Sequence, residues 1–246
     1  MSRRSQTGAA EALEEIQTGA DRLAEWIRDH LVIVVGVLVV VLAIAGGIQL
    51  TLSVGEKRET AASTALAGVR AEYLAAMGAP AGSLEVPELA NPEAAKRIRS
   101  EFAVRFAEIA DAHLGTVSGA LARLESGNLL AESGDLQRAS EIWQGLLSEA
   151  PRQDNLRGLI LQRLAHAHED AGHWREAAER HEEASALSGF PLRHWALADA
   201  ARCFAAAGEN ERALETYERL QTVAPELRLP EHQRAQFETL RAVAGG

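Results

Sequence analysis

Histidine and acidic side chains, the usual ligands of zinc, gather near the end of one predicted helix. The stretch from His166 to His173 reads HAHEDAGH. Metal ligands on a helix must be three or four residues apart to share a face. His166 and Asp170 meet this condition, but two ligands make an incomplete site, and His168 and His173 are five residues apart. His168 and His181 occupy repeat positions that rings normally fill, so we interpret them as packing residues and predict no metal site.

No other pattern in the sequence indicates catalysis. The single cysteine, Cys203, directly precedes Phe204 in an apolar part of a predicted helix, where a buried thiol is typical. The sequence contains no phosphate-binding loop, no G-x-S-x-G motif and no convincing pair of carboxylates. We therefore predict a protein that is not an enzyme and has no cofactor and no small-molecule substrate.

The charge balance argues against a nucleic-acid partner. The chain carries 35 Asp and Glu against 25 Lys and Arg, a net charge of −10. Binding to nucleic-acid phosphates requires a basic surface. The expected partners are therefore proteins.

The second half of the sequence contains a repeat built from glycine, alanine and a ring. Each unit has a glycine, an alanine five residues later, a ring four residues after that, and a proline or glycine a further eight residues on. The three units are Gly134, Ala139, Trp143, Pro151; Gly172, Ala177, His181, Gly189; and Gly208, Ala213, Tyr217, Pro225. This pattern is typical of tetratricopeptide repeats, in which the glycine lies in the turn between two paired helices.

These units predict an all-α fold: one transmembrane helix, then a tetratricopeptide-like solenoid of about three and a half repeats with a capping helix. Residues 119–246 contain three repeats and the C-terminal capping helix. Residues 53–118 form a degenerate first repeat with a Pro- and Gly-containing loop insert. No segment of useful length has the alternation typical of a strand.

A helical solenoid offers its partners a concave face lined by the first helix of each pair. Trp195, on the predicted first helix of the last repeat, is a large ring outside the packing pattern. It is therefore either an anchor for a partner chain or a side chain that fills the interior of the solenoid. Asn128 resembles the asparagine of the clamp that binds C-terminal carboxylates, but Leu124 and Asp199 stand where that clamp needs lysine and arginine. The candidate partner-binding residues are Leu124, Asn128, Gln162, His166, Glu169, Trp195 and Arg202.

An uncharged stretch of twenty-two residues, 31–52, predicts a transmembrane helix, because a helix of that length spans about 33 Å. A cleaved signal peptide ending near Ala43-Ile44-Ala45 is the alternative. The acidic, thirty-residue segment 1–30 is unlike a short basic signal-peptide start, which favours an uncleaved signal anchor. Arg3 and Arg4 favour a cytoplasmic N-terminal tail, although the charges flanking the helix nearly balance.

Three stretches carry a resemblance to a known family. They are WIRDHLVIVVGVLVVVLAIAG at 26–46, FAEIADAHLGTVSGALARLESGNLL at 106–130 and DNLRGLILQRLAHAHEDAGHWREAA at 154–178. The order of tail, signal anchor and repeats resembles the ancillary SecYEG translocon subunit (YfgM) family. The long N-terminal tail and the Pro-rich loop at 78–92 depart from it.

The resemblance implies a non-catalytic, single-pass protein of the bacterial inner membrane, with its N-terminus cytoplasmic and its C-terminal domain periplasmic. Its implied partners are translocon subunits, a periplasmic chaperone and exported chains. The alternative is a membrane-tethered tetratricopeptide assembly factor for another envelope complex.

Overall fold

The computed structural model describes the backbone over residues 31–83, 85–149 and 153–244, and the side chains over 53–83, 85–149 and 153–242. The predicted all-α fold is confirmed for these residues, which contain helices and no strand. The helices are α2 (Leu31–Ala76), α3 (Pro92–Ala112), α4 (Val117–Glu132), α5 (Leu136–Glu149), α6 (Asp154–Asp170), α7 (Trp174–Ser185), α8 (Arg193–Ala206), α9 (Asn210–Val223) and α10 (Glu231–Ala244).

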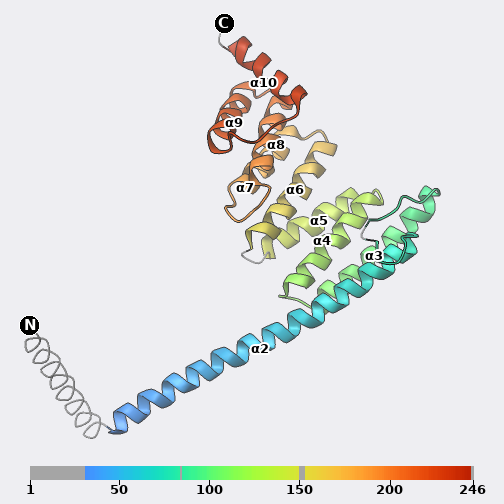
Figure 1. Ribbon diagram of the computed structural model, residues 1–246. Coiled ribbons are helices and arrows are strands. Elements are labelled where there is room, and N and C mark those ends of the chain that lie inside the picture. Colours follow the sequence, from blue (N-terminus) through green and yellow to red (C-terminus); the bar gives the residue numbers. More distant parts are fainter. Residues whose placement is uncertain (1–30, 84, 150–152, 245–246) are drawn as a thin grey trace, which may run out of the picture. The chain divides into compact units, whose positions relative to one another are not determined.

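Residues from Arg58 onward form one compact unit, in which helices pair as tetratricopeptide-like repeats. The pairs are α4 with α5, α6 with α7, and α8 with α9 (Figure 1). The predicted turn glycines Gly134, Gly172 and Gly208 join the two helices of each pair with φ of 92°, 76° and 79°. In this left-handed conformation the amide of the following residue reaches back to the first helix, as Asp135 N does to Leu130 O at 2.9 Å.

Within each pair, a small residue on the first helix makes room for the ring on the second. Trp143 covers Gly127 so closely that a Cβ on Gly127 would lie 2.4 Å from the indole Nε1. Ala165 and Ala201 are the equivalents of Gly127 in the next two repeats, and both are fully buried. His181 and Tyr217 take the ring positions of those repeats and are also buried. The spacing between small residue and ring therefore determines how the two helices pack.

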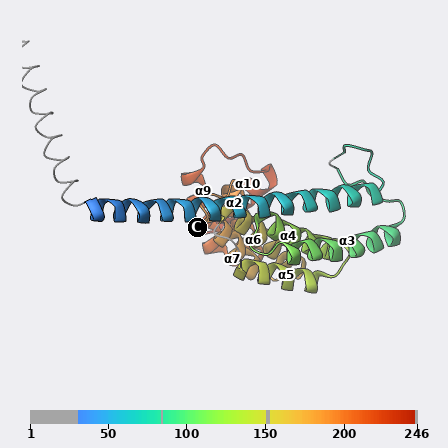
Figure 2. The same cartoon turned by 90° about the horizontal axis from the view of Figure 1, so that it is seen from below.

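At the N-terminal end of this unit, the last part of α2 packs against α3 and α4 (Figure 2). The rings of Tyr73 and Phe102 lie 5.4 Å apart between centroids, and Phe106 is buried beside them. Glu59 of α2 closes the start of α4: its carboxylate accepts hydrogen bonds from Val117 N at 2.8 Å and from Ser118 N at 2.9 Å. A carboxylate at this position satisfies amides that have no partner within the helix.

At the C-terminal end, α10 covers the last repeat. Phe237 is fully buried and stacks on Tyr217, with ring centroids 4.3 Å apart and an interplanar angle of 15°. This contact shields the ring of the third repeat from water, as expected for a capping helix.

Among the residues whose side chains the structure describes, no helix is long and apolar enough to cross a membrane. The proposed anchor at 31–52 lies outside that set, although its backbone is helical, and the proposed cytoplasmic tail at 1–30 lies outside the described residues altogether.

Candidate partner-binding groove

The first helices of the three repeats, α4, α6 and α8, lie side by side, so equivalent residues form rows across them (Figure 1). Equivalent positions are 38 residues apart between the first two repeats and 36 between the next two. Leu121, Leu159 and Trp195 form an apolar row; the side chains of Leu159 and Trp195 are 37% and 41% exposed. A second, polar row consists of Asn128, His166 and Arg202. The two rows together are called the groove rows below.

A cavity of about 500 Å³ lies at the N-terminal end of the polar row, lined by the end of α2, the loop that follows it, α3, α4 and α6. Tyr73, Asn128 and Arg163 are among the residues that line it. The Asn128 Nδ2 donates to Glu125 at 3.3 Å, whereas Asn128 Oδ1 and the Tyr73 hydroxyl are buried with no partner among the described residues.

Leu124 was predicted to line the groove, but the structure places it in the core. Its side chain is only 6% exposed and belongs to the core cluster that also contains Tyr73, Phe102 and Phe106. Leu124 cannot offer a partner a free side chain, because the degenerate first repeat packs over that face of α4. Its equivalent on α6, Gln162, is half-buried.

Three of the predicted groove residues, His166, Glu169 and Arg202, are brought together in one ionic network. Arg202 Nη2 donates to both oxygens of Glu169, at 3.0 and 2.8 Å, and contacts Asp199 at 3.2 Å. The ring of His181, fully buried on α7, lies with Nε2 2.9 Å from the same carboxylate. His166 Nδ1 is 3.6 Å away. The sequence did not reveal the contact with His181, although a polar ring at a packing position is a signal that a partner is needed nearby.

The network keeps Glu169 ionised. Burial opposes the charged form, but the hydrogen bonds from His181 and Arg202, the nearby His166 ring and the positive charge of Arg202 outweigh burial and hold the pKa of Glu169 well below its ordinary 4.5. Because an ionised carboxylate can only accept, we assign the proton of the His181–Glu169 hydrogen bond to Nε2.

His166, Glu169 and His181 are also the residues that could hold a metal ion, since one ligand atom from each lies within 4.8 Å of the others. Two imidazoles and a carboxylate are a reasonable donor set for zinc. Arg202, however, already holds both carboxylate oxygens, and the His181 nitrogen that faces the group carries a proton. The arrangement therefore favours an ion-pair network over a metal centre.

Cys203 is fully buried beside this network. Burial is the main cause that raises the pKa of its thiol to about 12. The thiol therefore stays protonated at neutral pH, whereas a nucleophilic cysteine must form a thiolate.

Comparison with solved structures finds other helical repeats. A crystal structure of nearly identical TPR-like repeats from Podosopora anserina, described there as those of a kinesin light chain, is 20% identical, with a TM-score of 0.47. That match covers 64% of this chain and 90% of the other. A single-substitution variant of the same repeats is 21% identical over 63% of this chain and 84% of its own, also with a TM-score of 0.47. No protein-family model and no curated protein matches the chain.

Proposed function

We propose that this protein is a non-catalytic, membrane-anchored scaffold whose groove rows bind other proteins. The observation that carries the proposal is the exposure of Leu159 and Trp195 at equivalent positions of neighbouring repeats. Large apolar side chains at regular intervals on one face are suited to anchor a partner chain. The polar row beside them supplies groups that can bind the partner's backbone or charges.

The spacing of the rows suits an extended partner. Packed helices lie about 8–10 Å apart, and a polyproline II chain repeats its side-chain direction every three residues, about 9 Å. One side chain in three can then contact successive residues of the apolar row.

We place the scaffold in the bacterial inner membrane, with residues 31–52 as the anchor, the N-terminus in the cytoplasm and the repeats in the periplasm. The uncharged stretch and the resemblance to the ancillary translocon subunits support this location. By the same resemblance, the proposed partners are subunits of the Sec translocon, a periplasmic chaperone and exported chains in transit.

Site-specific photo-crosslinking in cells tests the proposal. A photoreactive amino acid replaces Leu159 or Trp195 in the full-length chain, and Gln144, exposed on the second helix α5, serves as the matched control position. We expect crosslinks from Leu159 and Trp195 to translocon subunits, the chaperone or exported chains, identified by mass spectrometry, and none of these from Gln144.

The other outcomes separate the parts of the proposal. Groove-specific crosslinks to the components of a different envelope complex would favour the assembly-factor alternative over the translocon. Equal crosslinking from Gln144 and from the two groove positions would contradict the binding groove itself.

A further inference from the structure

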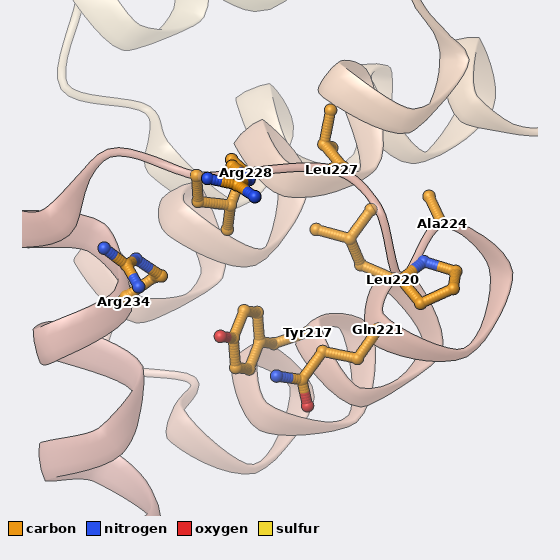
Figure 3. Close-up of a pocket in the computed structure, with 9 residues that line it drawn as sticks. Tyr217, Leu220, Gln221, Ala224, Leu227, Arg228 and Arg234 are labelled. Atoms are coloured by element: carbon orange, nitrogen blue, oxygen red, sulfur yellow. The ribbon is translucent and has the colours of Figure 1, made fainter.

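A cavity of about 490 Å³ lies at the C-terminal end of the repeats, between α9, the linker that follows it and the start of α10. Figure 3 shows Arg228 on the linker and Arg234 on α10 at the edges of this space, with Tyr217 and Gln221 of α9 beside it. None of the residues that line the cavity belongs to the groove rows or takes part in the function proposed above.

The charged groups of this cavity are two arginine side chains without a matching acid. Its lining includes two arginines and no Asp or Glu. Among the contacts of the described residues, neither Arg228 nor Arg234 forms an ion pair, whereas Arg219 and Arg241 nearby each pair with a glutamate. Two arginines therefore line one cavity without a carboxylate, in a chain whose net charge is −10.

Two further contacts prepare the cavity for an acceptor. Gln221 Oε1 accepts a hydrogen bond from Arg241 at 3.3 Å, and the amide of Gln221 also carries two N–H groups that can donate to a ligand. Tyr217, whose side chain lines the cavity, is held in place by the stacking of its ring on Phe237. The remaining wall is apolar. It is formed by Leu220 of α9 and by the linker residues Ala224, Pro225, Leu227 and Leu229.

We propose that this cavity binds a carboxylate attached to an apolar group. Arg228 and Arg234 pair with the carboxylate oxygens, because a guanidinium matches a carboxylate in charge and geometry. The Tyr217 hydroxyl and the Gln221 amide donate to the same ligand, and its apolar part lies against Leu220 and Ala224. The carboxylate can belong to a partner's C-terminal residue or to a free small molecule.

Calorimetric titration of the full-length chain in mild detergent tests the site with three probes. They are N-acetyl-Ala-Leu-Leu with a free C-terminal carboxylate, the same peptide as its C-terminal amide, and butyrate. We expect saturable binding of the acid peptide and at least tenfold weaker binding of the amide. Butyrate that binds as tightly as the acid peptide would identify a free small molecule as the source of the carboxylate, and weaker butyrate binding would identify a peptide.

The paired variant Arg228→Gln with Arg234→Gln provides the second arm, and Arg219→Gln on α9 is its matched control outside the cavity. Both replaced arginines in the pair are exposed, so the fold is expected to survive. We expect the paired variant to bind the acid peptide at least tenfold more weakly, and Arg219→Gln to bind it unchanged. Absence of saturable binding of both the acid peptide and butyrate, equal binding of acid and amide, or equal losses in the two variants would each overturn the site.

Discussion

At the scale of single residues, His181 is the position at which this protein departs from a purely apolar repeat. The ring positions of the other two repeats hold Trp143 and Tyr217, whereas His181 places two ring nitrogens in a fully buried site. A buried polar group without a partner costs roughly 1–3 kcal/mol. Glu169 removes that cost for Nε2, and Arg202 in turn neutralises Glu169.

Glu169→Gln is expected to lower the free energy of unfolding by about 2 kcal/mol, the scale of hydrogen bonds to a charged group. The amide loses the charge that holds Arg202 and leaves the His181 ring with a weaker acceptor. Equilibrium urea unfolding measures the change, with Glu215→Gln, an exposed position on α9, as the control. Equal stability of the two variants would contradict a structural role for the network.

The same network predicts a dependence on pH. The pKa of Glu169 is depressed in the folded protein, so its contribution is fully present above its ordinary pKa of about 4.5 and is lost as the pH falls below that value. The stability difference between the natural chain and Glu169→Gln should therefore shrink as the pH falls below about 4.5. Urea unfolding of both chains at several pH values measures this difference. A difference that grows on acidification would contradict a lowered pKa of Glu169 in the folded protein.

At the scale of helices, the close approach of a small residue to a ring sets the geometry of each pair. Gly127 has no room for a Cβ against Trp143, whereas a Cβ on Gly145, in the middle of α5, would have no neighbour within 4 Å. These two helical glycines therefore differ only in what surrounds them, and they form a natural pair for substitution.

Gly127→Ala should destabilise the protein by about 1–3 kcal/mol, because the added methyl group forces the indole or the helix to move. Gly145→Ala should stabilise it by about 0.5–1 kcal/mol, because alanine favours the helix and meets no obstacle. Thermal and urea unfolding compare the two variants. A stabilising Gly127→Ala would show that the contact with Trp143 is looser than the structure has it.

The sequence predicted the helix pairs because their signal is local. A turn glycine, the small residue before it and the ring after it all fall within a single repeat, and the three units repeat this pattern. The core position of Leu124 was missed, since it depends on the degenerate α2–α3 segment that packs over it. The cavity near Arg228 was also missed, because it depends on the path of the linker, which follows no periodic pattern.

At the scale of the whole molecule, the proposed topology can be tested with protease. An epitope tag at the N-terminus of the full-length chain should survive protease added to intact spheroplasts, whereas the repeats should be degraded. We expect this because Arg and Lys residues that flank a membrane anchor favour the cytoplasmic side. Lysed spheroplasts, in which both parts are accessible, provide the control. Loss of the tag and survival of the repeats would establish the opposite orientation.

The sharing of Glu169 between two repeats has a consequence for how the array can evolve. Its first partner, His181, belongs to the same repeat, but Arg202 comes from the next one, and the equivalents of Glu169 in the other two repeats are Ala131 and Ala205. Shuffling or deleting units would therefore leave the half-buried carboxylate of Glu169 without Arg202. A unit inserted between the α6–α7 pair and the α8–α9 pair would separate Glu169 from Arg202, so these two pairs have to follow each other directly.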